Sequence, residues 1–243
     1  MKTVLITGVG KGFGKELLLK LKDKYSLIGI TRSQEDIDLL RAEIDSCETN
    51  VDLLLGDVSE QDFLEEVLKP LLIQKGSIWG VVNNAGVRFR KDFLEVAKQD
   101  INEVLDINLI APIMLAQMCI PFMISSGGGR LINISSILSQ SALPQLSIYA
   151  TSKGAIDAFT RSIAVEFGSK NITCNSILPG FCETSYFPKF QKNNELYRMT
   201  IERTPMKMWG ASTELNEICE LLLGDGGSYI NGASIPVDGG WLA

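Results

Sequence analysis

The fold of this chain is decided by the stretch Thr7-Gly8-Val9-Gly10-Lys11-Gly12-Phe13-Gly14 and by the segments that flank it. The short apolar, β-branched run 2–7 predicts a buried strand, and the apolar spacing in 16–21 predicts a helix. Glycines at such a junction allow a tight turn and a close approach of the backbone to a pyrophosphate, and the helix N-terminus offers free N–H groups. The stretch therefore indicates a dinucleotide-binding loop. The alternative is a glycine-rich turn without a ligand.

Strand and helix patterns alternate along the rest of the chain. Strands are predicted at 2–7, 26–31, 51–55, 78–82, 130–135, 172–178 and 233–237, and helices at 16–21, 36–47, 61–73, 101–124, 147–167 and 213–223. We find no linker or repeat, so the pattern predicts one α/β domain over 1–243 with a mostly parallel sheet. Residues 181–212 have no clear period but are rich in aromatic residues and methionine. They predict an apolar flap or substrate wall, or else a loop packed on its own domain.

The end of the second predicted strand bears on the choice of cofactor. In a dinucleotide fold, an acidic residue there binds the 2′-hydroxyl of NAD, whereas arginine accommodates the 2′-phosphate of NADP. Thr31 and Arg32 occupy this position, no acid precedes Glu35, and Lys11 in the glycine loop adds a second positive charge. NADP(H) is therefore expected rather than NAD(H). The alternative is that Arg32 is a solvated surface charge.

A tyrosine and a lysine in the helix 147–167 form a candidate proton-transfer pair. Tyr149 and Lys153 are four residues apart, which places both side chains on one face of a helix. A nearby ammonium favours the phenolate and lowers the pKa of a tyrosine, so that the pair can exchange protons near neutral pH. Ser136 lies just upstream, at the end of the predicted strand 130–135. The spacing is common by chance, so the alternative is an ordinary exposed helix face.

The composition excludes several classes of function. The net charge of -6 disfavours nucleic acid as a partner, and we find no uninterrupted apolar run of membrane-spanning length. The five cysteines are scattered without a C-x-x-C pair, which is typical of a reducing cytoplasm. The chain contains no histidine, which removes Ser-His-Asp chemistry and histidine-ligated metals, and no metal site is expected.

Taken together, these motifs resemble the short-chain dehydrogenase/reductase family, most closely its 3-oxoacyl-carrier-protein-reductase-like branch. The matching residues are Thr7 to Gly14, Asp57, Asn83 to Gly86, Asn108, Ser136, Tyr149, Lys153, Pro179, Gly180 and the ending Val237 to Gly240. They occur in the family's order across essentially the whole chain. The resemblance implies a Rossmann-like, doubly wound parallel sheet of about seven strands, with helices on both faces. It also implies hydride transfer between a nicotinamide cofactor and a carbonyl or alcohol.

The resemblance also implies a role for individual residues. Tyr149 would be the general acid, Lys153 would lower its pKa and bind the nicotinamide ribose, and Ser136 would hold the substrate oxygen. Asn108 would bind a water molecule that links Lys153 to solvent. The cofactor would be held by Gly8, Lys11, Gly12, Phe13, Gly14, Thr31, Arg32, Asp57, Val58, Asn84, Ala85, Gly86, Tyr149, Lys153, Pro179, Gly180 and Thr184.

The substrate and partners are less defined. Basic residues that would dock an acidic acyl carrier protein are sparse, with Arg130 and Lys170 at the two expected places. Arg88 and Arg90 either contact an anionic substrate or face water, and water is the expectation. The alternatives are an NAD-dependent sugar or polyol dehydrogenase and, in another class, a catalytically silent nucleotide-binding regulator. The resemblance further implies a homotetramer or homodimer built on the helices 101–124 and 147–167.

Overall fold

The computed structural model describes residues 1–44, 50–184, 187 and 194–243, and its centre is one seven-stranded parallel sheet. The strand order is β3-β2-β1-β4-β5-β6-β7, and every neighbouring pair is parallel. The strands are β1 (Thr3–Thr7), β2 (Ser26–Thr31), β3 (Val51–Leu55), β4 (Gly80–Asn83), β5 (Gly129–Ile134), β6 (Ile172–Pro179) and β7 (Ser234–Val237). This confirms the predicted doubly wound sheet. The chain reverses direction across the sheet between β1 and β4, where such folds bind ligands.

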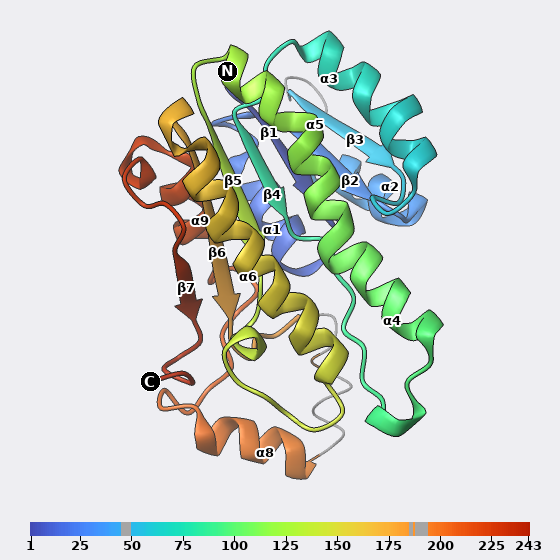
Figure 1. Ribbon diagram of the computed structural model, residues 1–243, viewed down its shortest axis with the longest axis vertical. Coiled ribbons are helices and arrows are strands. Elements are labelled where there is room, and N and C mark those ends of the chain that lie inside the picture. The colour runs from blue at the N-terminus through green and yellow to red at the C-terminus, as the bar shows by residue number, and fades with distance from the viewer. Residues whose placement is uncertain (45–49, 185–186, 188–193) are drawn as a thin grey trace.

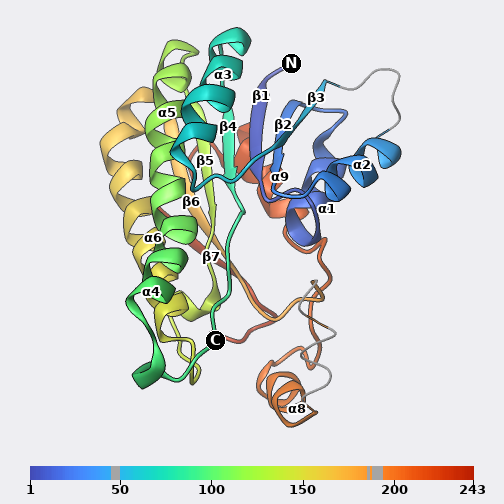
Figure 2. The ribbon, with the colours of Figure 1, turned by 90° about the vertical axis from the view of Figure 1, so that its right-hand side faces the viewer.

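Helices cover both faces of the sheet (Figures 1 and 2). One face carries α3 (Lys69–Lys75), α4 (Lys98–Leu105), α5 (Ala111–Ser125) and α6 (Ser147–Phe167). The other face carries α1 (Gly12–Leu21), α2 (Gln34–Glu43) and α9 (Asn216–Leu223). Each face has its own apolar core cluster. Because both faces are covered, β1 and β6 are buried at every residue, and β1 is accordingly apolar from Val4 to Ile6.

The predicted helix 101–124 is part of a longer helix, Lys98–Ser125, that contains a π-helical turn at Asp106–Ile110. The turn directly precedes Pro112, whose nitrogen has no proton to donate into the helix ladder. By length and composition this helix could also cross a membrane, although Asn108 and Gln117 interrupt its apolar sequence. Half of its most apolar window is buried inside the protein, and Leu115, Cys119 and Met123 belong to the core. The packing therefore explains its apolar sequence.

The region 181–212 differs from its prediction, because it contains the helix α8 (Asn194–Arg203). This helix is polar on average, and Thr200 is its one fully buried residue among those described, so its sequence does not stand out as a core helix. Figure 1 shows α8 beyond the carboxyl ends of the strands. Parts of this region (185–186 and 188–193) and residues 45–47 of the predicted helix 36–47 lie outside the described residues.

Candidate active site

The glycine loop forms the floor of a site at the carboxyl end of β1. Gly8 and Gly12 have positive φ angles of 72° and 58°, which side chains disfavour. A Cβ atom on Gly14 would collide with the carbonyl oxygen of Gly8, so the loop can fold back on α1 only with glycine there. No side chain of the described residues caps the N-terminus of α1. Its first residues, Gly12 and Phe13, line the cavity together with Lys11. The loop thus fits a pyrophosphate.

Hydrogen bonds hold the ends of β1 and β4 together at this loop. The buried Thr7 hydroxyl accepts the backbone N–H groups of Asn84, at 3.0 Å, and Ala85, at 2.9 Å. The Asn84 side chain donates from Nδ2 to the carbonyl oxygens of Thr7, at 2.9 Å, and Gly8, at 3.0 Å. Asn84 therefore braces the glycine loop and leaves the backbone after β4 facing the cavity.

A cavity of about 650 Å³ runs along the carboxyl edge of the sheet and unites most of the predicted site. Two predicted residues, Gly14 and Asn108, are outside its lining, because Gly14 packs beneath the loop and Asn108 is buried in the π-helical turn. The predicted residues that line it are Gly8, Lys11, Gly12, Phe13, Thr31, Arg32, Asp57, Val58, Asn84, Ala85, Gly86, Ser136, Tyr149, Lys153, Pro179, Gly180 and Thr184.

The end of the cavity at β2 and β3 carries three charged side chains. Arg32 donates from NH1 to Asp57 Oδ2 at 3.2 Å, and 61% of the Arg32 side chain is exposed. Burial raises the pKa of Asp57, but hydrogen bonds from Ser59 and Arg32 outweigh it and the pKa is lowered. The sequence did not point to Asp36, whose carboxylate accepts a hydrogen bond from the Thr31 hydroxyl at 3.2 Å. A guanidinium at this rim can bind a phosphate as readily as it binds Asp57.

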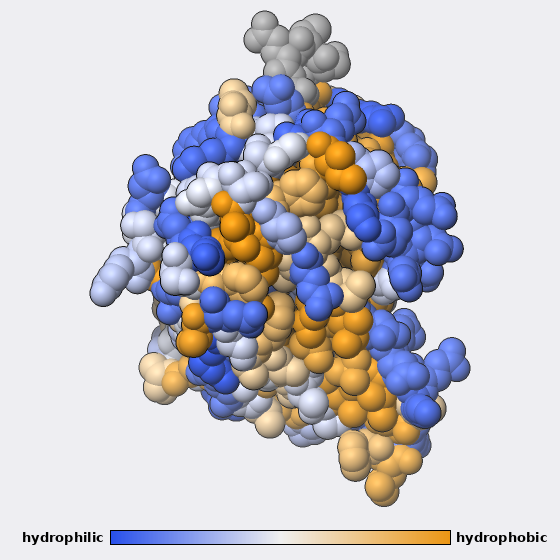
Figure 3. Space-filling view, turned by 45° about the horizontal axis from the view of Figure 1, so that its top comes forward, coloured by the Kyte–Doolittle hydropathy of each residue, from blue (hydrophilic) through white to orange (hydrophobic). Residues whose placement is uncertain are grey.

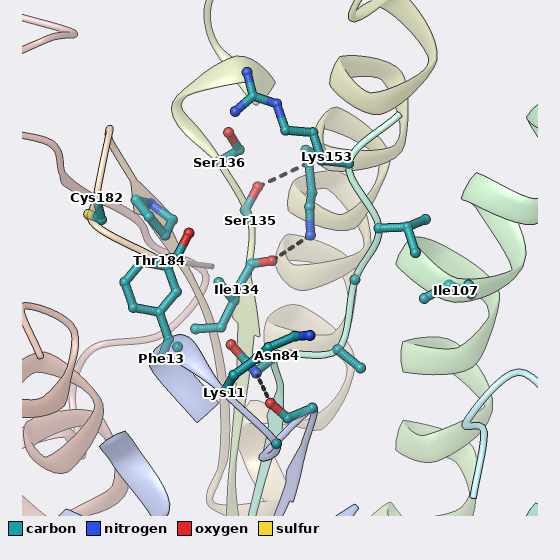
Figure 4. A pocket seen from close by; sticks show the side chains of 18 of the residues that line it. Lys11, Phe13, Asn84, Ile107, Ile134, Ser135, Ser136, Lys153, Cys182 and Thr184 are labelled. Carbon is teal, nitrogen blue, oxygen red and sulfur yellow. Dashed lines mark hydrogen bonds between the residues drawn. The ribbon is translucent and has the colours of Figure 1, made fainter. Parts of the chain in front are cut away.

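The other end of the cavity is lined by Ser136, Tyr149 and Lys153. Figure 4 shows Ser136 and Lys153 there. Lys153 belongs to the helix α6, and its Nζ donates to the Ile134 carbonyl oxygen at 2.7 Å. Lys153 is 6% exposed, and its Nζ lies 5.9 Å from the centroid of the Tyr149 ring. Loss of hydration lowers the pKa of Lys153 to about 8, against the attraction of Asp157. The site therefore holds a desolvated cation beside a phenol.

Asn108 is buried and connects two segments that carry lining residues of the cavity. Its Oδ1 accepts the Val87 N–H at 2.8 Å, and its Nδ2 donates to the Val87 carbonyl at 2.9 Å and to the Ser152 hydroxyl at 3.1 Å. The side chain thus ties the segment after Gly86 to the helix that carries Lys153. The water-binding role expected of Asn108 remains a prediction.

Further lining residues could not be found from motifs. Leu138, Phe181 and Trp209 form an apolar wall, with Phe181 stacked 5.3 Å from Trp209 between ring centroids. The aromatic composition of 181–212 was the one sequence signal for this wall. Arg88 also lines the cavity, a position that fits either of the two expectations for it, an anionic substrate or water. Arg90 instead is exposed and donates from Nε to Gln145 Oε1 at 2.9 Å.

Comparisons with known proteins extend the likeness over the whole chain. A family model described as enoyl-(acyl carrier protein) reductase matches residues 8–242. The chain is 32% identical to 3-oxoacyl-[acyl-carrier-protein] reductase FabG of Thermotoga maritima, over 98% of this chain and 97% of that protein. It is also 32% identical to L-xylulose reductase of Caenorhabditis elegans, over 99% of this chain and 95% of that protein. A solved gluconate 5-dehydrogenase from Burkholderia cenocepacia, in complex with NADP and tartrate, has a TM-score of 0.92 at 27% identity, covering 99% of this chain and 95% of that one.

Proposed function

This chain belongs to the short-chain dehydrogenase/reductase family of oxidoreductases, and on that premise we propose that it is an NADP(H)-dependent carbonyl reductase or alcohol dehydrogenase. The observation that supports the proposal most is the buried Lys153 ammonium beside the Tyr149 ring, in a cavity that Ser136 also lines. A pKa of about 8 leaves most of this lysine protonated at pH 7. A cation held there stabilises negative charge on the phenol oxygen as it gives up its proton.

The roles of the residues follow from this arrangement. When bound, the nicotinamide supplies a hydride to the carbonyl carbon or accepts one from the alcohol carbon. Tyr149 donates a proton to the carbonyl oxygen in reduction and takes it back in oxidation. Ser136 holds that oxygen by a hydrogen bond, and Lys153 stabilises the phenolate. The apolar wall of Leu138, Phe181 and Trp209 keeps water from the reacting atoms.

The preference for NADP(H) rests on Arg32 at the rim of the cavity. Its guanidinium would exchange its bond with Asp57 for the 2′-phosphate, with Lys11 as a second cation. Asp36 lines the same end, but its carboxylate is held by Thr31 and packs against Gly10. The solved relative in complex with NADP also supports this preference.

A small free carbonyl compound suits this chain better than a substrate on an acyl carrier protein. Arg130, one of the two basic residues at the expected docking places, is 2% exposed. Its NH1 donates to the Gly129 and Asn171 carbonyls, and its guanidinium stacks 4.6 Å from the centroid of Trp79. Because Arg130 is buried and bonded to backbone carbonyls, its charge attracts an acidic partner protein only weakly. The sugar reductase relative, as similar as the carrier-protein reductase, supports small substrates.

We further propose that the enzyme assembles as a homotetramer or homodimer through the outer faces of α5 and α6. The apolar residues Ile124 and Val165 are exposed on these helices, and Met118 and Phe159 are only partly buried. Figure 3 shows apolar side chains gathered in a band on the molecule's surface. The four described cysteines form no disulfide, which suits the cytoplasm in which we propose that the enzyme works.

The decisive experiment measures NADPH oxidation with acetoacetyl thioester, L-xylulose and small oxo acids, in the wild type and in Tyr149→Phe. The variant keeps the ring but lacks the acidic proton, so we expect kcat to fall by about 100-fold or more while the Kd for NADPH stays within about threefold. Full activity of Tyr149→Phe would refute the proton-donor role. Cofactor binding without turnover of any carbonyl by the wild type would favour the silent regulator.

The cofactor choice is tested by Arg32→Asp, compared with Arg41→Asp on the exposed face of α2. Loss of a charge-assisted contact to the 2′-phosphate should lower the ratio of kcat/KM for NADPH over NADH by about 10- to 100-fold. The Arg41→Asp variant makes the same change of charge and should leave the ratio unaltered. An unchanged ratio in Arg32→Asp would show that this arginine does not recognise the 2′-phosphate, and would favour the NAD-linked alternative.

A further inference from the structure

The loop after β4 carries Arg88 to the catalytic end of the cavity. At its start, a Cβ atom on Gly86 would stand 3.6 Å from Lys153 Nζ, so the loop begins against the catalytic lysine. At its end, the Lys91 N–H donates to the Gln145 carbonyl oxygen at 3.0 Å, in the segment that leads into the helix of Tyr149. Arg88 lies between these two anchors, is partly buried and lines the cavity.

The two neighbouring cations of the same loop make their contacts outside the cavity. Arg90 is exposed and bonds Gln145, and Lys91 forms an ion pair with Asp100 at 2.7 Å. Of the three, Arg88 alone is among the residues that line the cavity in the described part of the chain. The loop therefore delivers one guanidinium to the cavity, and the Val87 backbone bonds to Asn108 hold the residue before it in place.

Charge is distributed unequally between the two ends of the cavity. Its two acidic lining residues among those described, Asp36 and Asp57, both lie at the end of Arg32. The catalytic end combines the cations Arg88 and Lys153 with the apolar wall of Leu138, Phe181 and Trp209. A cationic pocket with low-dielectric walls strengthens the attraction of an anion. The apolar wall of this pocket offers few hydrogen-bond partners to the hydroxyl groups of a neutral polyol.

We propose that Arg88 is a specificity-determining residue that binds a carboxylate of the substrate, so that the enzyme acts on small oxo acids or the corresponding hydroxy acids. This inference rests on the proposed function, because it names the substrate class of the same site. The planar guanidinium matches a carboxylate in two parallel hydrogen bonds. One arginine suits a monoanion, whereas a phosphate dianion would call for more positive charge.

The test compares substrates of closely similar shape, one with the carboxylate charge and one without it. Acetoacetate is paired with acetoacetamide, and levulinate with its methyl ester. Binding of each compound to the NADP⁺-loaded protein is measured by calorimetry, where no hydride can be transferred, and kcat/KM is measured with NADPH. For at least one pair, the wild type should bind the acid about 10- to 100-fold more tightly than the neutral partner.

Three variants assign this preference to Arg88. Arg88→Gln should abolish it while the affinity for the neutral partner stays within about threefold, and Arg88→Lys should keep part of it. Arg90→Gln removes the same charge from the same loop and should keep all of it. The Kd for NADPH and the thermal midpoint of each variant verify that the fold and the cofactor site are intact.

The outcomes separate this inference from the proposed function. Equal binding of acids and neutral partners, or a preference that survives in Arg88→Gln, overturns the carboxylate site even if the enzyme reduces these carbonyls well. Tighter binding of dihydroxyacetone phosphate than of every carboxylate also overturns it. Loss of the preference in Arg88→Gln by calorimetry supports the site even when turnover is absent, in which case only the proposed function fails.

Discussion

Replacing Lys153 by methionine should remove a pH dependence of stability that the wild-type protein carries. The side chain is 6% exposed, and loss of hydration lowers its pKa from 10.5 to about 8. Between pH 8 and 10.5 the unfolded chain therefore binds a proton at this site that the folded chain does not. The free energy of unfolding must rise with pH across this window, and the cost of burying the charge is fully present below it.

The magnitude follows from the two pKa values. A shift of this size corresponds to about 3 kcal/mol in total, of which about 2.5 kcal/mol is recovered between pH 7 and pH 10. Methionine has a similar length and does not titrate, so it lacks this recovery. The lost bond to the Ile134 carbonyl and the lost attraction between Lys153 and Asp157 add an offset to the comparison. The prediction uses only the change of the difference with pH, from which a constant offset cancels.

The assay is urea unfolding of the cofactor-free protein at several pH values, with and without Lys153→Met. Both proteins should carry Tyr149→Phe, so that titration of the neighbouring phenol cannot contribute. The free energy of unfolding of the lysine-containing protein, minus that of the methionine variant, should rise by about 2.5 kcal/mol from pH 7 to pH 10. A difference that stays level would refute the desolvation argument. A falling difference would show that the folded protein stabilises the ammonium instead.

Two further predictions concern the loops that shape the cofactor site. Thr7→Val keeps the side-chain shape but leaves the N–H groups of Asn84 and Ala85 without their acceptor. The free energy of unfolding in urea should therefore fall by about 2 to 4 kcal/mol. A fall below about 0.5 kcal/mol would contradict these bonds. Gly14→Ala should weaken NADPH binding at least about tenfold, because its Cβ would collide with the Gly8 carbonyl. Gly154→Ala, a helix glycine with only an ordinary contact at 3.9 Å, is the control and should raise stability by about 0.5 to 1 kcal/mol. Equal NADPH affinity in both glycine variants would exclude the proposed role of the loop.

Much of the fold was predictable because the strands are short, mainly apolar segments that alternate with helical patterns along the chain. All seven strands were found to within about two residues on this basis. The helix α6 (Ser147–Phe167) was predicted with its exact bounds. The helix α8 was not, because it is polar on average and buries few of its residues, so its sequence does not stand out as a core helix. The π-helical turn at Asp106–Ile110 was also missed, although Pro112 marked a disturbance nearby.

The amino-acid sequence by itself determined the features that depend on neighbouring residues: the glycine turn after β1, the Tyr149 and Lys153 pair on one helix face, and the order of strands and helices along the chain. Only the tertiary structure decided which distant side chains meet. It turned Arg88 into the cavity and Arg90 onto Gln145, and it buried Arg130 against Trp79. Local spacing sets the face of a helix or the shape of a turn. The environment of a loop side chain depends on contacts between segments far apart in the chain, and such contacts leave no period in the sequence.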